Sequence, residues 1–258
     1  MSKKRAMTSE KASYVKLKGH QDAREFAEAI GIGKEFMSEP QAKKDVIDSK
    51  GYSYSVKSGE KKWQIFLYSK SRFETDFTFQ GMNGLGSLFL KCIDVFPLNR
   101  NEYLKDKLKY KNKLSPIMRD IKERLSKKNL LEAFLDKSLF NSGEVNFFVI
   151  KQENAFHIFL NKDVVKTFSR NISVENSIAR RKDQVDAQKV VFKFQNKTIG
   201  EIEMRNDSEI HYRELKFWLD KKLSFQLLSS EIKPNKILNT KIILYGGAIR
   251  KLRHLLIK

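Results

Sequence analysis

The stretch KKDVIDSKGYSYSVKSGEKKWQIF, residues 43–66, alternates apolar and polar side chains and is interrupted by two turn signals. The first turn signal is Ser49-Lys50-Gly51 and the second is Ser58-Gly59. Alternation with a period of two is typical of strands, and glycine favours the turns between them. The expected strands cover residues 46–47, 52–56 and 62–69. The stretch therefore predicts a three-stranded antiparallel meander.

Three polar side chains in this meander have a spacing that suits phosphodiester hydrolysis. Ser55 and Lys57 are two residues apart, so they point to the same face of one strand, and Asp45 lies on the preceding strand. Hydrolysis of a phosphodiester commonly uses a hard divalent cation held by carboxylate oxygens. A lysine near the attacking water stabilises the developing charge. The spacing of Asp45, Ser55 and Lys57 is compatible with such a site.

The segment DVIDSKGYSYSVKS, residues 45–58, resembles the active-site hairpin of the PD-(D/E)XK nuclease superfamily, in particular PvuII-like type II restriction endonucleases. The resemblance implies a mixed central sheet with flanking helices and a restriction-endonuclease-like core. It assigns metal binding to Asp45 and the catalytic amine to Lys57. It also implies Mg²⁺ as cofactor, double-stranded DNA as substrate, a homodimer acting on a palindrome, and a cognate DNA methyltransferase as genetic partner.

One position departs from this family, because Ser55 stands where the family usually has Glu or Asp. Ser55 is then expected beside the metal ligands, with the missing carboxylate supplied by Glu74 or, as an alternative, by Glu60. Superfamily members often add a glutamate from the preceding helix, where Glu25 fits better than its neighbour Glu28. Asp48 is expected to be solvated near the turn. The alternatives are a surface hairpin with a Lys57–Asp45 ion pair, or an inactive nuclease fold.

The charge of the chain indicates a polyanionic partner. Fifty-one Lys and Arg against 31 Asp and Glu give a formal charge of +20, and such a charge attracts nucleic acid at long range. A single cysteine, Cys92, and four scattered histidines exclude a disulfide framework and argue against structural zinc. There is neither an apolar run of about 18 residues nor a secretory signal, so we expect a soluble, cytoplasmic protein without membrane contact.

The remaining chain divides into an α/β core and a second half rich in β-hairpins. Other expected elements are helices at residues 20–30 and 87–96, a basic helical pair over 101–128 broken near Ser115-Pro116, hairpins at 144–161 and 190–205, and a helix at 209–228. The expected organisation is a basic flexible arm (residues 1–18), a catalytic core (19–130) and a DNA-recognition part (131–258), the last two packed as one domain.

Two basic groups in the second half are candidates for DNA contact. Arginine suits guanine edges and asparagine suits adenine, and clustered cations suit phosphates. The candidates are Arg180, Arg181 and Lys182 as a phosphate clamp, and Arg205, Asn206, His211 and Arg213 for base contacts. Glu201 and Glu203 are rival metal ligands, which we disfavour because no lysine follows two residues later; an ordinary ion pair is the structural alternative.

These patterns predict a type II restriction endonuclease, a hydrolase that makes Mg²⁺-dependent double-strand cuts at a specific sequence. The alternative from another functional class is a non-catalytic DNA- or RNA-binding protein that uses the same basic surface.

Overall fold

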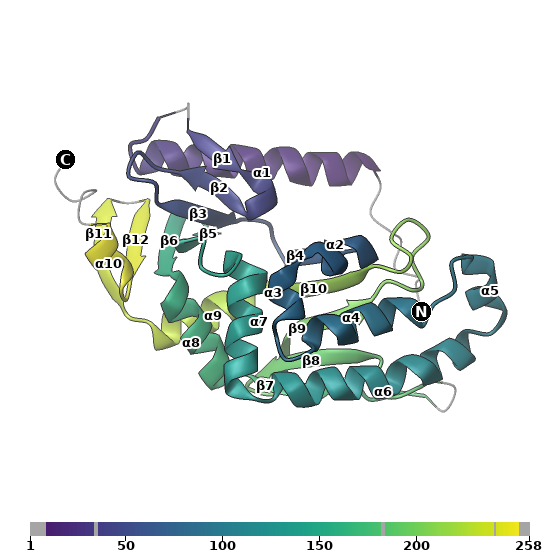
Figure 1. The fold of residues 1–258 in the computed structure, drawn as a ribbon. Coiled ribbons are helices and arrows are strands. Elements are labelled where there is room, and N and C mark those ends of the chain that lie inside the picture. Colours follow the sequence, from purple (N-terminus) through teal and green to yellow (C-terminus); the bar gives the residue numbers. More distant parts are fainter. Residues whose placement is uncertain (1–8, 34–35, 182–183, 240, 253–258) are drawn as a thin grey trace. The chain divides into compact units, whose positions relative to one another are not determined.

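A computed structural model describes residues 9–33, 36–181, 184–239 and 241–252 (Figure 1). Contacts divide the chain into two units, which are described separately. The first unit comprises Met1–Glu60, Gly143–Val164 and Ile232–Lys258. The second unit comprises Lys61–Ser142 and Val165–Glu231.

The first unit contains a seven-stranded mixed sheet in the order β1-β2-β3-β5-β6-β12-β11. Its strands are β1 (Met37–Glu39), β2 (Lys44–Ile47), β3 (Ser53–Lys57), β5 (Phe147–Gln152), β6 (Ala155–Leu160), β11 (Pro234–Asn239) and β12 (Ile242–Tyr245). The pairs β3–β5 and β6–β12 are parallel, and the other neighbours are antiparallel. The central strand β5 therefore pairs with β3 of the β2–β3 hairpin on one side and with β6 of its own hairpin on the other.

Helix α1 (Ser9–Ala29) packs on one face of this sheet (Figure 1). Its apolar stripe includes Phe26, whose ring meets Tyr54 at 5.2 Å and Phe156 at 5.3 Å between centroids. The short helix α10 (Ala248–Lys251) contributes Ala248 to the same core. A 3-10 turn, η1 (Pro40–Ala42), connects β1 and β2. Burial of these apolar side chains stabilises the packing of α1 and α10 on this face of the sheet.

The second unit contains a five-stranded antiparallel sheet in the order β4-β10-β9-β8-β7. Its strands are β4 (Lys62–Tyr68), β7 (Ser173–Asn176), β8 (Lys189–Phe194), β9 (Lys197–Met204) and β10 (Leu215–Asp220). Its helices are α2 (Lys70–Thr75), α3 (Phe77–Gln80), α4 (Leu85–Asp94), α5 (Arg100–Lys105), α6 (Lys107–Leu125), α7 (Lys128–Phe140) and α9 (Lys221–Glu231). Helix α8 (Asn161–Asn171) begins in the first unit and continues into the second.

Phenylalanine side chains form the core of the second unit. Phe134 of α7 lies 5.1 Å from Phe217 of β10 and 6.2 Å from Phe192 of β8, between ring centroids. Phe66 of β4 contacts the same cluster. Tilted and edge-on aromatic contacts of this kind add to the stabilisation from burial. One face of the second sheet is thus covered by helices.

The mixed α/β architecture and both hairpins of the second half are confirmed. β5 and β6 pair along their full length, and β8 and β9 turn through Gln195 and Asn196, both at positive φ. The mixed sheet has flanking helices, as expected, and a second, antiparallel sheet was not anticipated.

Two strands differ from the sequence-based expectation. Residues 62–68 do not complete a meander with β3 but pair with β10 in the second sheet, while β3 pairs with β5. The helix expected over 209–228 is a strand, β10, followed by the shorter helix α9. The apolar residues of β10 have a spacing that favours a helix, but hydrogen-bonded pairing with β4 and β9 on both sides stabilises a strand instead.

The helices also differ in their limits. The basic helical pair breaks at Asp106, which caps α6, and α6 continues through Pro116. Burial of the apolar residues on α6, such as Met118 and Ile121, offsets the backbone hydrogen bond that proline cannot make. Residues 9–18 of the expected arm belong to α1, and its residues 1–8 lie outside the described part of the chain. The two units also do not follow the expected boundary at residue 130.

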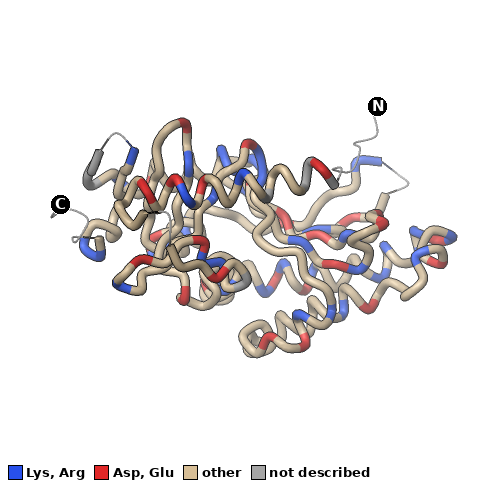
Figure 2. Tube along the Cα trace, turned by 90° about the horizontal axis from the view of Figure 1, so that it is seen from above, with Lys and Arg blue, Asp and Glu red and all other residues tan. Residues whose placement is uncertain are grey.

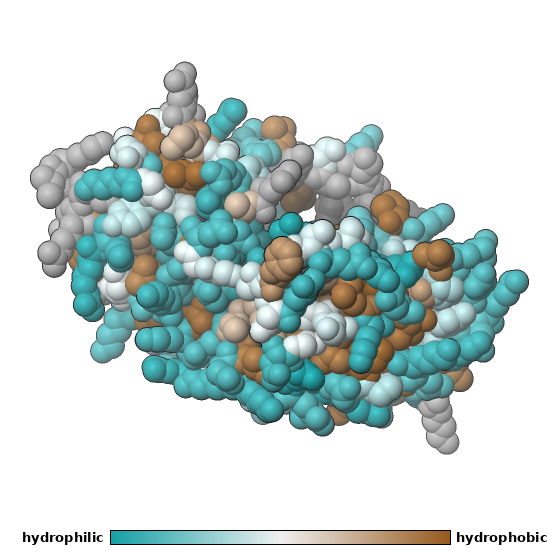
Figure 3. All heavy atoms as spheres, in the orientation of Figure 1, coloured by the Kyte–Doolittle hydropathy of each residue, from teal (hydrophilic) through white to brown (hydrophobic). Residues whose placement is uncertain are grey.

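Lys, Arg, Asp and Glu residues occur along both units (Figure 2), and the face drawn in Figure 3 is mostly hydrophilic, with apolar residues exposed in several areas. In the described part of the chain, no helix combines the length and the apolar character that crossing a membrane requires.

Candidate active site

The turn between β2 and β3 is held by Asp48. Its Oδ1 accepts hydrogen bonds from the backbone N–H groups of Lys50 and Tyr52, both at 2.9 Å, and its Oδ2 accepts one from the Tyr54 hydroxyl at 2.9 Å. Burial, together with the Asp48 carboxylate, raises the pKa of Tyr54 above its ordinary value. Asp48 is 3% exposed, so the expectation of a solvated aspartate is wrong. The side chain is a structural part of the hairpin.

The hairpin brings Asp45, Ser55 and Lys57 into contact. Asp45 Oδ2 accepts a hydrogen bond from the Ser55 hydroxyl at 3.3 Å, and Lys57 Nζ donates to Ser55 Oγ at 2.8 Å. The Lys57 Nζ to Asp45 Oδ2 distance is 4.0 Å. The neighbouring residue Val56 packs toward α1, so alternation along β3 directs Ser55 and Lys57 to the opposite face of the sheet. A carboxylate, a hydroxyl and an ammonium group therefore form one cluster.

The backbone holds Asp45 in a fixed orientation. Its Oδ2 also accepts the N–H of Val56 at 2.7 Å, a short bond to a charged acceptor. Among the described residues, none donates a hydrogen bond to Oδ1 of Asp45. The side chains of Asp45 and Lys57 are 29% and 20% exposed, whereas Ser55 is fully buried beneath them. A carboxylate with one oxygen fixed and the other accessible can ligate a cation.

Only part of a metal site is present in this cluster. Within the described ranges, no group of three His, Cys, Asp or Glu side chains is arranged to hold a metal ion. Mg²⁺ usually keeps several waters and needs only one or two protein carboxylates besides substrate phosphates. Asp45 fits such a role, with further oxygen ligands from water and substrate.

Glu25 does not join this cluster. It lies on α1, on the other face of the sheet, where its Oε2 is 2.6 Å from Lys151 Nζ. Asp22 of the same helix lies 2.7 Å from that ammonium group. Burial lowers the pKa of Lys151, but its hydrogen bonds to the two carboxylates outweigh this effect and raise it. The predicted metal role of Glu25 therefore has no support from its position.

Three further glutamates were named from the sequence: Glu74 and Glu60 for the second carboxylate, and Glu28 as the neighbour of Glu25. Glu74 lies on α2 of the second unit, where its carboxylate is 3.8 Å from Lys70 and half-exposed. Glu60 is exposed in the bend after β3, and Glu28 is exposed on α1. The role of Glu74 stays a prediction.

All four side chains predicted to contact bases have intramolecular partners. Asn206 is 9% exposed and donates to the Tyr103 hydroxyl. His211 pairs with Glu214 at 2.8 Å. Arg213 donates to the Ile93 carbonyl and the Asp94 carboxylate, and Arg205 lies 3.6 Å from Glu203. Asn206 in particular has no amide edge exposed for an adenine.

The phosphate-clamp candidates are placed differently. Arg180 and Arg181 are exposed in the loop between β7 and β8, and Lys182 lies outside the described residues. Hydrogen bonds inside the loop fix its backbone: the N–H of Ala179 donates to the Asp186 carboxylate, and the N–H of Arg180 donates to the Gln184 side chain. The two arginines remain available for an external anion.

Glu201 and Glu203, the rival metal ligands, bind a lysine in the second unit. Lys189 Nζ lies 2.9 Å from Glu201 and 2.7 Å from Glu203. Burial raises the pKa of Glu203, but Lys189 more than compensates and lowers it. The carboxylates of Glu201 and Glu203 therefore form ion pairs within the sheet, which was the alternative to metal binding expected from the sequence.

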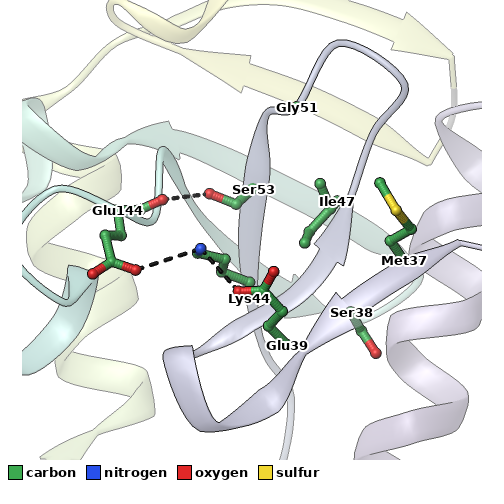
Figure 4. A pocket seen from close by; sticks show the side chains of 8 residues that line it. All are labelled: Met37, Ser38, Glu39, Lys44, Ile47, Gly51, Ser53 and Glu144. Carbon is green, nitrogen blue, oxygen red and sulfur yellow. Dashed lines mark hydrogen bonds and ion pairs between the residues drawn. The ribbon is translucent and has the colours of Figure 1, made fainter.

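A pocket of about 490 Å³ lies beside the β2–β3 hairpin (Figure 4). Its lining residues are Met37, Ser38, Glu39, Lys44, Ile47, Gly51, Ser53 and Glu144. Lys44 bridges Glu39 at 2.9 Å and Glu144 at 3.4 Å, and these hydrogen bonds raise its pKa. Sequence reasoning missed this pocket, because Glu144 is remote in the chain and only folding brings it to the hairpin.

No protein-family model matches the chain, and neither the curated proteins nor the solved structures contain one with significant similarity to it.

Proposed function

We propose that this protein is a magnesium-dependent DNA endonuclease of the type II restriction class. The observation that supports it best is the contact of Asp45, Ser55 and Lys57 on one face of the hairpin. These residue types at this spacing resemble the active-site hairpin of PD-(D/E)XK nucleases. The mixed sheet with flanking helices and the charge of +20 are compatible with such an enzyme.

Each residue of the cluster has a distinct task in this proposal. Asp45 would ligate magnesium through Oδ1, while the Val56 N–H keeps Oδ2 in place. Lys57 would orient the attacking water and face the charge that develops on the phosphate. Ser55 would set the position of the lysine through its hydroxyl group. Magnesium, when bound, supplies polarisation of the phosphate and a lower pKa for the attacking water.

The complete proposal includes further partners. Glu74 would provide the second carboxylate, and Arg180 and Arg181 would contact DNA phosphates. A homodimer acting on a palindromic site, and a DNA methyltransferase encoded nearby, belong to the same proposal, because a two-fold enzyme matches a two-fold site.

A second candidate is a non-catalytic nucleic-acid-binding protein. The observation that favours it is the single carboxylate in the Asp45 cluster, where the family usually has two. In that case the positive charge would bind nucleic acid and the hairpin would be a remnant of an active site.

The test is cleavage of unmethylated bacterial DNA by the purified protein in magnesium. Discrete fragments are expected, and Asp45→Asn and Lys57→Met should each reduce the cleavage rate at least about a hundredfold. Glu39→Gln and Lys44→Met are matched controls, since they remove a neighbouring ion pair from the same part of the sheet. Binding of DNA without fragments, in magnesium or manganese, would favour the second candidate.

A further inference from the structure

The second sheet has a polar face opposite its phenylalanine core. Cross-strand neighbours on this face form a row in which Lys216 of β10 pairs with Glu203 of β9, and Glu203 pairs with Lys189 of β8. In the next row, Trp218 is opposite Glu201. We call the side chains of Lys62, Lys189, Glu201, Glu203, Arg205, Lys216, Trp218 and Asp220 the charged face.

The carboxylates of the charged face are already engaged. Glu201 and Glu203 both bind Lys189, and Glu203 also lies 3.6 Å from Arg205. Asp220 Oδ1 accepts the N–H of Leu223 at the start of α9. Four cations therefore share three carboxylates, one of which also binds a helix terminus.

Two lysines on this face have no carboxylate partner. No carboxylate oxygen of the described residues lies within 4.0 Å of the ammonium group of Lys62 or of Lys216. Lys62 Nζ lies 3.2 Å from the centre of the Trp218 ring, a cation–π contact. Burial lowers the pKa of both lysines, more than the nearby glutamates raise it. Burial of a cation costs free energy when no carboxylate contacts it, and a bound anion in contact with the ammonium group would reduce that cost.

We propose that the charged face binds backbone phosphates of nucleic acid through Lys62 and Lys216. The two ammonium groups donate no hydrogen bond within the described chain, and Arg205 contributes a third positive charge near Lys216. Trp218 is 5% exposed with Lys62 over its ring, so it serves as the support for that lysine and does not stack on bases. Phosphate contacts of this kind give affinity without sequence specificity.

Nucleic acid is the ligand that the charge of the chain favours. A net charge of +20 draws a polyanion toward the surface, whereas a single small anion gains less from it. The choice of DNA rests on the proposed function, but the site itself requires only a phosphodiester backbone. None of its residues belongs to the Asp45 cluster.

The test measures binding of a fluorescent 30-base-pair duplex at several salt concentrations, with calcium in place of magnesium. The variant Lys62→Gln/Lys216→Gln should bind at least about tenfold more weakly. The slope of log K against log salt should fall by about 2, as expected for two lost phosphate contacts. Lys62→Arg/Lys216→Arg should keep the slope, which separates loss of charge from damage to the fold.

Lys193→Gln is the matched control, because Lys193 lies on β8 of the same sheet and already pairs with Glu175. It should change the slope less than the double variant does. If the wild type and the double variant bind the duplex with equal affinity, the inference is overturned. This holds even if the wild type cleaves DNA. If millimolar inorganic phosphate raises the unfolding temperature of the wild type but leaves its affinity for the duplex unchanged, the assignment of the ligand to nucleic acid is overturned. If the double variant lowers the slope of log K against log salt but the wild type does not cleave DNA, the inference is supported and the nuclease proposal is contradicted.

Discussion

Asp45 and Asp48 lie on the same short segment but serve different purposes. Asp48 is buried and uses both carboxylate oxygens to hold the turn and Tyr54. Asp45 is partly exposed and shares its Oδ2 between Ser55 and a backbone N–H. Alternation along a strand cannot separate two such aspartates, because the difference depends on which side chains surround each one. Asp45 and Lys57, which the sequence pattern places together, lie 4.0 Å apart, whereas the prediction of a solvated Asp48 is wrong.

A prediction at this scale concerns His157, which is 8% exposed on β6 and whose Nδ1 lies 2.9 Å from the Tyr245 hydroxyl. Burial lowers the pKa of His157 from 6.5 to about 4. Between pH 6.5 and 4 the unfolded chain therefore binds a proton at His157 that the folded chain does not bind. The contribution of His157 to the free energy of unfolding is complete above pH 6.5 and is lost as the pH falls toward 4. The contribution should be about 2 kcal/mol after allowance for solvent screening.

Urea unfolding of wild type and of His157→Asn between pH 4 and 8 measures this effect. The variant should lose less unfolding free energy over the acidic interval, since asparagine does not titrate. Identical pH profiles for the two proteins would contradict the assignment to His157.

At the scale of elements, β10 illustrates how neighbours decide secondary structure. Its residues have apolar spacing compatible with a helix, yet they pair with β4 on one side and β9 on the other. One side of β10 enters the phenylalanine core and the other carries Lys216 and Trp218. The close approach of β9 to β10 depends on Gly200, where a Cβ atom would lie 2.7 Å from the Trp218 carbonyl oxygen.

Gly200→Ala should lower the free energy of unfolding by about 1–3 kcal/mol, because the added methyl group meets the backbone of the neighbouring strand. Gly19→Ala is the contrasting change: Gly19 lies inside α1, and beyond the backbone of its own helix the added carbon would meet nothing within 4 Å. That change should raise stability by about 0.5–1 kcal/mol through helix propensity. Chemical denaturation of both variants checks the pair, and a neutral effect of Gly200→Ala would contradict the packing described for β9.

At the scale of the whole molecule, each unit is assembled from separate parts of the chain. The first unit draws its sheet from three segments, so the hairpin with Asp45 and Lys57 depends on β5 for its parallel neighbour. Contacts between segments so distant in sequence carry a large entropic cost of loop closure and form only when the complete core can assemble. The boundary expected at residue 130 separates β3 from this partner.

A fragment of residues 1–130 should therefore not fold as an independent catalytic core. It lacks β5, β6, β11 and β12, which leaves one edge of β3 unpaired and the apolar side chains of α1 without most of their partners. Circular dichroism and thermal unfolding of the fragment test this expectation. A cooperative transition like that of the intact chain would show that the first 130 residues are sufficient.

The sequence by itself determined the local features of this protein: the hairpins, the apolar stripe of α1, and the placement of Asp45, Ser55 and Lys57 on a common face. These follow from strand and helix periodicity, which act over a few residues. Only the tertiary structure decided that β4 leaves the first sheet, that β10 is a strand, that Glu25 binds Lys151, and that Lys62 and Lys216 share one face of the second sheet. Those outcomes depend on pairing between distant segments, and the energy of such pairing comes from neighbours that local patterns do not identify.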